Sequence, residues 1–341
     1  MYPQLSWKRA RARALAILRG LLAACIVAAS PLAAAFDLQA HRGGRALLPE
    51  NTLAAFENAI RIGVTTLELD IAITADGIPV ISHEPYVFAG LARGADGKWL
   101  EQNGPLIHSL TLAEVQRFDV GRLNPAHPYG KDFPSQQPRD GERIPTLASL
   151  FDLVRRLGAA DVQFDIETKV FPNRPGDTLP PEEFVPILLG AIRDAGMTKR
   201  VMIQSFDWRT LRIVQRLEPG MRTVFLTLRS KNTDNVASPS WTGGLVLGDY
   251  PSVAHMIRAA GGTVWAPSQR NIEAADVGRA HALGLLLIPW TVNDLSDMRR
   301  LIDWGVDGII TDRPDRLREV LAERGLPLPP ALPDASEPKV R

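Results

Sequence analysis

Acidic and imidazole side chains gather in residues 39–84 at spacings that could build a catalytic site. Glu68 and Asp70 lie two positions apart in the run TLELDIAI, and the side chains of a β-strand alternate between its two faces. Both carboxylates would therefore share one face, opposite leucine and isoleucine side chains. Two acids on a buried strand are costly unless something neutralises them, and a divalent cation is the simplest neutraliser. The pair predicts half of a metal site.

The segment 161–168 repeats this pattern on a second predicted strand. Glu167 and Lys169 fall on one face near the carboxyl end of the strand, and the residues that alternate with them are apolar. Three carboxylates on adjacent strands, from Glu68, Asp70 and Glu167, would form an oxygen-rich site for one hard divalent cation, Ca²⁺ or Mg²⁺. Zinc suits the set less well because acids dominate it. The alternative for Glu167 and Lys169 is an ion pair inside the fold.

Two histidines and two cationic side chains complete a candidate site for a phosphate ester. His41 directly follows the first predicted strand, and His83 ends the strand that returns after an Asp-Gly turn. A neutral imidazole can accept or donate a proton near pH 7, so the two histidines are expected to act as general acid and base. Arg42 offers a planar guanidinium to phosphate oxygens, and Lys169 adds a second positive charge.

Other motifs have a structural interpretation beside the functional one. In the motif PENT, Asn51 or Thr52 would cap the start of a helix, which explains the motif without any functional role. Gln204 ends a strand and could hydrogen-bond the site or be structural. Trp290 could belong to the core, but an apolar wall for the carbon skeleton of a substrate is favoured. The remaining histidines are expected on the surface or in packing roles: His108, His127, His255 and His281.

These residues need a scaffold that brings the ends of several strands together. Apolar strand-like runs are predicted at 38–41, 66–72, 161–168, 201–205, 223–227, 263–267, 285–291 and 307–311. Helical patterns follow most of them, at 52–62, 146–157, 181–195, 207–217, 252–260, 273–283, 294–304 and 315–323. The alternation predicts a (β/α)8 barrel with its site at the carboxyl ends of the strands. A doubly wound open sheet is the alternative, but no Gly-rich dinucleotide motif opens a helix.

The boundaries of the domain follow from the same patterns. The turn at Asp76-Gly77 predicts a hairpin between 71–74 and 78–82, which would return His83 towards the acids. Residues 85–145 form a long insertion rich in Gly and Pro, predicted to be a cap over the barrel mouth. The barrel is expected over residues 36–325, followed by a Pro-rich disordered tail at 326–341.

The first 35 residues have the layout of a secretory signal. Five basic residues precede an apolar run, and Ala33-Ala34-Ala35 offers a cleavage site, so the mature protein is expected in the periplasm or outside the cell. An uncleaved membrane anchor is the alternative, but the apolar run is shorter than the ~20 residues that a membrane span needs. After cleavage of the signal, no stable membrane span is expected. A lipoprotein box at Cys25 is disfavoured because apolar residues continue beyond it. Without this segment the net charge is −4, which argues against nucleic-acid binding.

Nine short motifs together resemble the glycerophosphodiester phosphodiesterase family. They occur in order from about residue 38 to 320, and the set is specific although each motif alone is weak. The motifs are His41-Arg42-Gly43, Pro49-Glu50-Asn51-Thr52, Glu68-Leu69-Asp70, Thr74-Ala75-Asp76-Gly77, His83, Glu167-Thr168-Lys169, Gln204-Ser205-Phe206, Trp290-Thr291-Val292-Asn293 and Asp307-Gly308-Ile309-Ile310-Thr311-Asp312.

The resemblance implies a TIM barrel that hydrolyses glycerophosphodiesters to glycerol 3-phosphate and an alcohol. It also implies roles for individual residues: His41 and His83 as catalytic acid and base, Glu68, Asp70 and Glu167 as ligands of Ca²⁺ or Mg²⁺, and Arg42 and Lys169 as phosphate-binding groups. The insertion is similar to the small cap of the family. The chain departs from the family at Glu84, where aspartate is usual, and the added methylene could shift the hydrogen bond that orients the His83 imidazole.

Two other functions stay open at this stage. A phospholipase D-like enzyme could use the same barrel on lysophospholipids or sphingolipids, for which an exposed apolar rim is needed. The insertion supplies candidates for that rim: Tyr86, Val87, Phe88, Leu91 and Trp99. A non-catalytic phosphate-binding protein on a decayed barrel is the second alternative, and the complete set of histidines and acids argues against it. The alcohol group, the native cation and the oligomeric state are not predicted.

Overall fold

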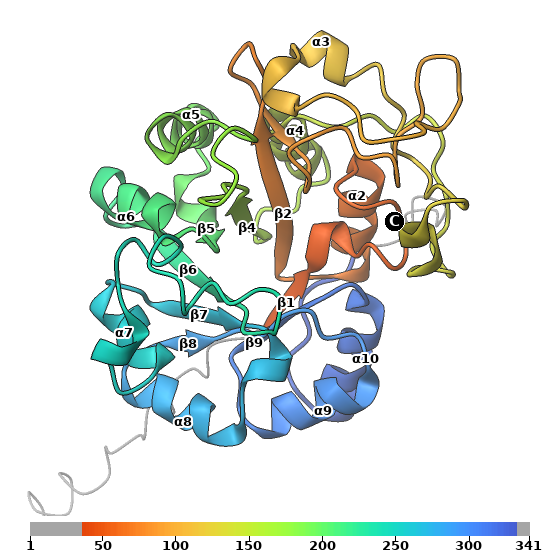
Figure 1. Ribbon diagram of the computed structural model, residues 1–341. Coiled ribbons are helices and arrows are strands. Elements are labelled where there is room, and N and C mark those ends of the chain that lie inside the picture. Colours follow the sequence, from red (N-terminus) through yellow and green to blue (C-terminus); the bar gives the residue numbers. More distant parts are fainter. Residues whose placement is uncertain (1–35, 333–341) are drawn as a thin grey trace, which may run out of the picture. The chain divides into compact units, whose positions relative to one another are not determined.

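Eight parallel strands form a barrel with helices on its outside in the computed structural model, which describes residues 36–332 (Figure 1). The barrel strands are β1 (Asp37–Ala40), β2 (Thr66–Ile73), β4 (Gln163–Thr168), β5 (Val201–Ser205), β6 (Arg222–Thr227), β7 (Val264–Pro267), β8 (Leu286–Leu287) and β9 (Gly308–Thr311). The helices between and after them are α2 (Leu53–Ile62), α4 (Leu147–Arg156), α5 (Pro181–Asp194), α6 (Trp208–Leu217), α7 (Val253–Ala259), α8 (Ala274–Ala282), α9 (Leu295–Asp303) and α10 (Pro314–Glu323). The predicted signal 1–35, with Cys25, and residues 333–341 lie outside the described residues.

The strands follow the order β8-β7-β6-β5-β4-β2-β1-β9, and every neighbouring pair in this order is parallel. Backbone hydrogen bonds from Asp307 to Leu287 (3.0 Å) and from Ile310 to Pro289 (3.0 Å) join the two ends. The predicted (β/α)8 barrel is confirmed, and the open doubly wound sheet is excluded. β8 is shorter than the predicted run 285–291, because Pro289 has no N–H for the ladder.

The barrel interior is apolar on one side and acidic on the other. A buried apolar cluster comes from the strands β5 to β9 and their ends: Met202, Val224, Leu226, Val264, Ala266, Ile288 and Ile310. On β2, Leu67 and Leu69 instead belong to the main core, between the sheet and the helices. The alternation of side chains therefore turns Glu68 and Asp70 inward, where both are buried.

The predicted hairpin at Asp76-Gly77 is present and leads into the insertion. β3 (Pro79–Ile81) pairs antiparallel with the end of β2. Residues 85–145 follow β3 and contain the short helices η2 (Ile107–Ser109), α3 (Leu112–Val115) and η3 (Pro128–Lys131). They have a small buried core together with the hairpin: Ala72, Val80, Val87, Ala92, Ile107, Val115, Val120 and Ile144. The insertion is therefore a packed unit attached to the end of β2 (Figure 1).

The first residues of the predicted disordered tail, 326–341, contact the barrel. The Leu332 N–H donates to the Arg61 carbonyl (3.2 Å), and Arg318 Nη1 donates to the Pro329 carbonyl (2.7 Å). Proline carbonyls can accept hydrogen bonds from a neighbouring helix, so the Pro-rich composition of 326–332 does not prevent these contacts. Disorder of the tail as a whole stays a prediction.

The connection between β1 and α2 begins with a left-handed turn, η1 (His41–Gly43). Arg42 has φ 52° and Gly43 has φ 80°. A Cβ on Gly43 would lie 2.9 Å from the Ala55 Cβ and 3.0 Å from the Phe56 nitrogen in α2. Glycine is therefore required at position 43 both for its φ and for the close packing of the turn on the helix.

Gly43→Ala is expected to lower the free energy of unfolding by about 2–5 kcal/mol, because left-handed strain and a clash with backbone atoms add together. Gly77→Ala is the matched control, since Gly77 also has φ 77° but no atom lies within 4 Å of its added Cβ. Strain alone should cost about 1–2 kcal/mol there. Urea titrations of both variants measure the difference, and equal losses would contradict the packing role of Gly43.

Candidate active site

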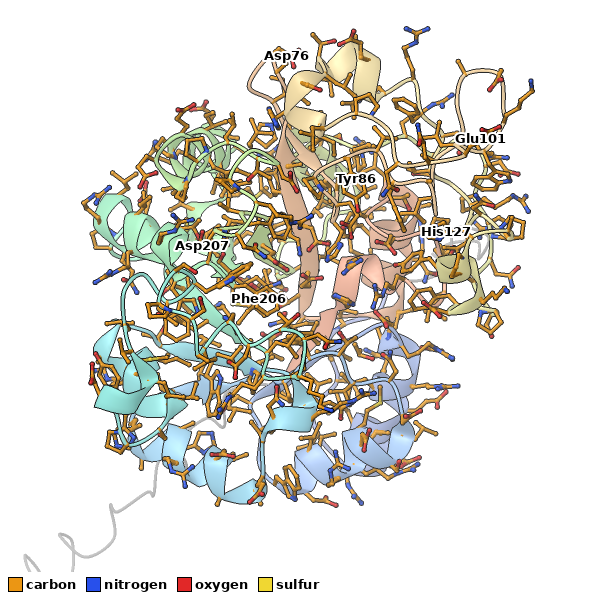
Figure 2. The ribbon with its side chains drawn as sticks, viewed as in Figure 1. Asp76, Tyr86, Glu101, His127, Phe206 and Asp207 are labelled. Atoms are coloured by element: carbon orange, nitrogen blue, oxygen red, sulfur yellow. The ribbon has the colours of Figure 1, made fainter. Side chains whose placement is uncertain are left out.

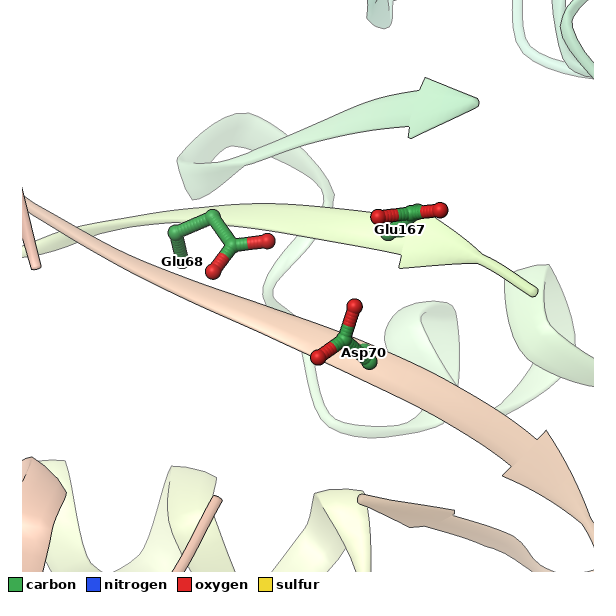
Figure 3. Close-up of side chains that lie close together, drawn as sticks. All are labelled: Glu68, Asp70 and Glu167. Carbon is green, nitrogen blue, oxygen red and sulfur yellow. The ribbon is translucent and has the colours of Figure 1, made fainter. Parts of the chain in front are cut away.

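Three carboxylates meet where β2 runs beside the end of β4 (Figure 3). Glu68 and Asp70 come from β2 and Glu167 from β4, and Asp70 and Glu167 are register partners. One oxygen from each carboxylate lies within 4.8 Å of the others, and all three side chains are buried. Oxygens bound to one ion at ~2.3–2.6 Å can be at most about 5 Å apart, so the spacing fits a single hard cation. Asp70 Oδ1 is buried and accepts no hydrogen bond from the described residues, which leaves it available as a ligand.

Hydrogen-bond donors from other elements hold two of the carboxylates. Glu68 accepts from the Arg42 N–H (2.8 Å) and from the Gln204 side chain (2.6 Å). Asp70 accepts from the Asn51 side chain (3.0 Å). Gln204, whose role the sequence left open, therefore contacts the site. Asn51 does too, although the sequence assigned it only to the start of a helix.

The carboxylates are strongly coupled through their charges. Burial raises the pKa of Glu167 to about 7, and burial together with the Asp70 charge raises the pKa of Glu68. Burial would also raise the pKa of Asp70, but the nearby cationic side chains and the Asn51 amide lower it. Lys169 Nζ lies 2.9 Å from Glu167 Oε1 and 3.7 Å from Asp70 Oδ1, so the ion pair considered for it is formed. The raised pKa values of Glu68 and Glu167 favour their protonation, and Lys169 supplies a positive charge, so both reduce the negative charge of the cluster. A divalent cation could neutralise this charge instead.

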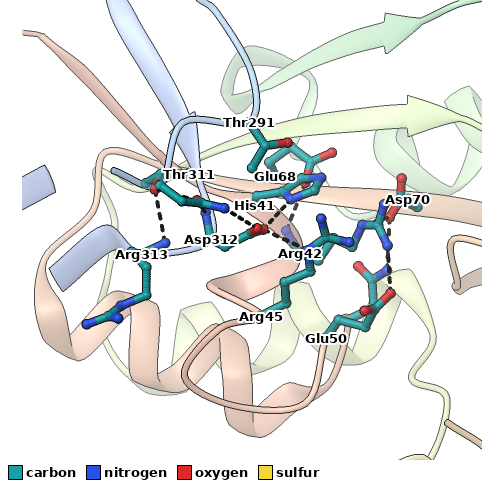
Figure 4. A network of polar contacts seen from close by, with 12 residues as sticks. His41, Arg42, Arg45, Glu50, Glu68, Asp70, Thr291, Thr311, Asp312 and Arg313 are labelled. Atoms are coloured by element: carbon teal, nitrogen blue, oxygen red, sulfur yellow. Dashed lines mark hydrogen bonds and ion pairs between the residues drawn. The ribbon is translucent and has the colours of Figure 1, made fainter. Parts of the chain in front are cut away.

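His41 is oriented by a carboxylate after the last strand (Figure 4). Its Nδ1 lies 2.6 Å from Asp312 Oδ1. Asp312 also accepts from Arg45 (2.7 Å) and Asn293 (2.7 Å). Burial opposes ionisation of Asp312, but His41 and Arg45 lower its pKa. The ionised Asp312 carboxylate therefore accepts the hydrogen bond that His41 Nδ1 donates. The other nitrogen, Nε2, lies 4.0 Å from Glu68. Asp312 had no predicted role, although its position directly after β9 was a signal.

His83 has an equivalent partner in the residue that departs from the family pattern. Its Nδ1 lies 2.7 Å from Glu84 Oε1, so the glutamate reaches the imidazole despite its extra methylene. The pKa of both imidazoles is lowered to about 4, mainly by burial. The next largest cause is the charge of Arg45 for His41 and the charge of Arg42 for His83. Both rings are therefore neutral near pH 7, the state in which an imidazole can accept a proton.

Arg42 lies between two carboxylates. Its Nη1 is 2.7 Å from Glu50 Oε1, and its Nε is 3.2 Å from Asp70 Oδ2. The Asn51 N–H donates to the Arg42 carbonyl (3.0 Å), and the Thr52 hydroxyl caps α2 as predicted. The PENT motif therefore starts the helix and also supplies Glu50 to Arg42, a role that sequence reasoning missed because it joins two side chains across a turn.

A cavity of about 250 Å³ lies over these groups. Seven of the predicted site residues line it: His41, Arg42, Glu68, His83, Glu167, Lys169 and Trp290. Asp70 is not on the lining, which is completed by Arg45, Gln204, Phe206, Leu226, Thr291 and Ile310. Trp290 packs edge to face on Phe206, with ring centres 5.4 Å apart, and donates its indole N–H to the Ala266 carbonyl (2.9 Å). Phe206, labelled in Figure 2, follows β5. Trp290 is therefore a wall of the cavity that is anchored in the barrel.

The cavity brings together two imidazoles, the buried Arg42 and Lys169 side chains, and carboxylates of the cluster. These groups, on the strands of a barrel, define an enzyme of the (β/α)8-barrel class with a site suited to a phosphate ester. The model of the glycerophosphoryl diester phosphodiesterase family matches residues 41–316. The chain belongs to this family and is an enzyme.

Named relatives and solved structures agree with this assignment. A glycerophosphodiester phosphodiesterase from Caldanaerobacter subterraneus subsp. tengcongensis is 32% identical over 84% of this chain and 98% of its own length. One from Bacillus subtilis is 32% identical over 82% of this chain and 85% of its own. A crystal structure from Silicibacter pomeroyi, of a protein assigned as a glycerophosphoryl diester phosphodiesterase, is 32% identical with a TM-score of 0.77. The match covers 86% of this chain and 95% of that one. A phosphodiesterase from Oleispira antarctica, solved with the product sn-glycerol-3-phosphate, shares the fold at 21% identity, with a TM-score of 0.62 over 83% of this chain and 96% of that one.

Proposed function

We propose that the enzyme hydrolyses glycerophosphodiesters to glycerol 3-phosphate and an alcohol, using one divalent cation, Ca²⁺ or Mg²⁺. The observation that carries this proposal is the cluster of Glu68, Asp70 and Glu167, whose oxygens lie within 4.8 Å of one another. Glu68 and Glu167 also line the cavity, together with the imidazoles of His41 and His83. The Oleispira antarctica relative was solved with sn-glycerol-3-phosphate, which is the product proposed here. The secretory signal predicted at residues 1–35 leads us to place the reaction in the periplasm or outside the cell.

In the proposed reaction the two histidines transfer protons. One of His41 and His83 removes the proton from the attacking oxygen, and the other protonates the departing alkoxide. The attacking oxygen is either the glycerol 2-hydroxyl, which would give a cyclic phosphate first, or a water molecule. Asp312 and Glu84 accept from Nδ1 of the two rings, so Nε2 is the nitrogen that exchanges protons with the substrate.

The cationic and aromatic side chains would bind the substrate. Arg42 and Lys169 line the cavity, where charge-assisted hydrogen bonds to phosphoryl oxygens would fix the diester. Trp290 and Phe206 form an apolar surface against which the glycerol carbon skeleton would lie. When bound by the carboxylate cluster, the cation supplies Lewis-acid stabilisation of negative charge on the phosphoryl oxygens.

The structure favours a small water-soluble diester over a lysolipid. The apolar residues of the insertion that could have formed a lipid-binding rim are buried or partly buried, and Val87 is 1% exposed. The large hydrophobic side chains that are exposed in the described part of the chain lie elsewhere: Leu217, Val246, Leu286 and Leu328. Within residues 36–332, no helix has both the length and the apolar character needed to cross a membrane.

An assay of glycerol 3-phosphate release tests the proposal. The purified enzyme should hydrolyse glycerophosphocholine and glycerophosphoethanolamine, lose this activity in EDTA, and regain it when Ca²⁺ or Mg²⁺ is added back. Lysophosphatidylcholine is the comparison substrate and should be turned over more slowly. Undiminished activity in EDTA would contradict the proposed cation, and faster turnover of the lysolipid would contradict the proposed substrate class.

A further inference from the structure

The insertion is attached to the connection between β1 and α2 by several contacts. The Gln137 N–H donates to the Leu47 carbonyl (2.8 Å), and the Gln136 side chain donates to the Arg45 carbonyl (2.7 Å). The Arg45 guanidinium lies over the Phe133 ring, 4.8 Å from its centre. These contacts fix the insertion beside the connection between β1 and α2, which begins with the turn η1 (His41–Gly43).

Tyr129, in η3, joins the insertion to the charged groups of this loop. Its hydroxyl donates to Glu50 Oε2 and accepts from Arg45 Nη1 (3.1 Å). Glu50 Oε1 in turn accepts from Arg42 Nη1 (2.7 Å). The Phe88 ring packs edge to face on Tyr129, with ring centres 5.3 Å apart, and keeps the phenol in place. One side chain of the insertion therefore reaches Arg42 through a single carboxylate.

Burial and charge make this chain of hydrogen bonds strong. Glu50 is 5% exposed and Arg42 is 7% exposed. Burial would raise the pKa of Glu50, but the charges of Arg42 and Arg45 lower it. Burial, and then the Glu50 charge, raise the pKa of Tyr129, so the phenol stays a neutral donor to an ionised acceptor. Loss of a hydrogen bond to a buried charge typically changes an equilibrium constant by about 10–100-fold.

Arg42 needs this support because other forces act on it. Its backbone has φ 52° and ψ 34°, a left-handed conformation that persists only where the surroundings fix it. Asp70 also attracts its guanidinium, since Asp70 Oδ2 lies 3.2 Å from Nε. Without Glu50, Asp70 would be the remaining one of the two carboxylates that hold the guanidinium, and Arg42 would pair with the cluster instead of binding phosphate.

We propose that Tyr129 is a positioning residue: acting through Glu50, it holds the Arg42 guanidinium in the orientation that binds the phosphoryl group of the substrate. This inference rests on the proposed function, because it takes Arg42 as a phosphate-binding group. It gives the insertion a direct part in the affinity of the barrel for phosphate, although Tyr129 itself does not touch the substrate.

A double-mutant cycle with inorganic phosphate as the probe tests this role. Tyr129→Phe removes only the hydroxyl and should raise the Kd for phosphate about 10-fold or more in calorimetric titrations. Tyr250→Phe, before α7, is the matched control and should bind as the wild type does. In an Arg42→Lys background, Tyr129→Phe should change the Kd less than 2-fold, because a single ammonium cannot contact Glu50 and phosphate as a guanidinium fork does. Glu50→Gln should repeat both results if Tyr129→Phe proves unstable in thermal melts.

Each outcome decides the inference. Wild-type phosphate affinity in a folded Tyr129→Phe would overturn it, and where Tyr129→Phe does not fold, wild-type affinity in Glu50→Gln would do so. An equal loss in the wild-type and Arg42→Lys backgrounds would also overturn it, because Tyr129 would then act independently of Arg42. The kcat and KM for glycerophosphocholine should show the change mainly in KM. If no variant, nor the wild type, hydrolyses the diester while the phosphate cycle behaves as expected, the proposed function fails and the positioning role stands.

Discussion

His83→Ala is expected to lower kcat for glycerophosphodiesters by about 10²–10⁴-fold, and His41→Ala should have an effect of the same order. Each imidazole is proposed to carry one proton transfer, and its loss leaves that transfer to water. Neither ring belongs to the carboxylate cluster. Calorimetric titration with Ca²⁺ should therefore give a Kd close to that of the wild type in both variants.

His255→Ala is the control for a general effect of removing a histidine. His255 lies on α7, where its ring contacts the Ser252 hydroxyl (2.9 Å), and its loss should leave kcat unchanged. Normal turnover in either His41→Ala or His83→Ala would refute the proposed pair of acid and base. A parallel loss of Ca²⁺ affinity would show that the histidine acts on the metal site instead.

The second large effect is expected from Glu68→Gln, which removes one anionic ligand without a change of shape. Affinity for Ca²⁺ should fall by at least about 100-fold. Because several kcal/mol of electrostatic stabilisation depend on the cation, kcat/KM should fall by roughly 10²–10⁴-fold. Burial raises the pKa of Glu68, so the cation-free protein already tends to hold it protonated, and glutamine resembles that form. The free energy of unfolding without cation should therefore change by less than about 1 kcal/mol.

Asp165→Asn is the matched control for this substitution. Asp165 is the register partner of Glu68 on β4, is fully buried, and has a pKa raised first by burial. It is not part of the carboxylate cluster, so its amide variant should keep the Ca²⁺ affinity and turnover of the wild type. Wild-type Ca²⁺ affinity in Glu68→Gln would refute the metal site, and equal losses in both variants would indicate a general effect on the barrel interior.

The carboxylate cluster could be predicted because the alternation of side chains along a strand is a local rule. The run TLELDIAI placed Glu68 and Asp70 on one face, and the parallel register then brought Asp70 beside Glu167. The periodicity of apolar residues likewise located the strands and helices, and the predicted segment 201–205 coincides with β5. Both kinds of pattern are contained within about ten neighbouring residues.

The partners of the proposed catalytic groups could not be found in this way. Asp312 is 271 positions from His41, and Tyr129 is 79 positions from Glu50, so only the closed barrel and the folded insertion bring them together. The contacts of residues 326–332 were missed for a different reason, because a Pro-rich composition does not show which neighbouring side chain will bind its carbonyls. Their composition indicated disorder, whereas the Arg318 side chain that binds the Pro329 carbonyl is supplied by α10.

The two ends of the insertion meet at the β3 hairpin. The Ile81 N–H in β3 donates to the carbonyl of Pro145, the last residue of the insertion (2.8 Å). The insertion therefore leaves and re-enters the barrel at one point. For a flexible loop closed at such a point, doubling the length would cost only about 0.6 kcal/mol in closure entropy. Segments from other sources could therefore be grafted here without redesign of the eight-stranded framework, provided that each graft retains a hydroxyl donor for Glu50.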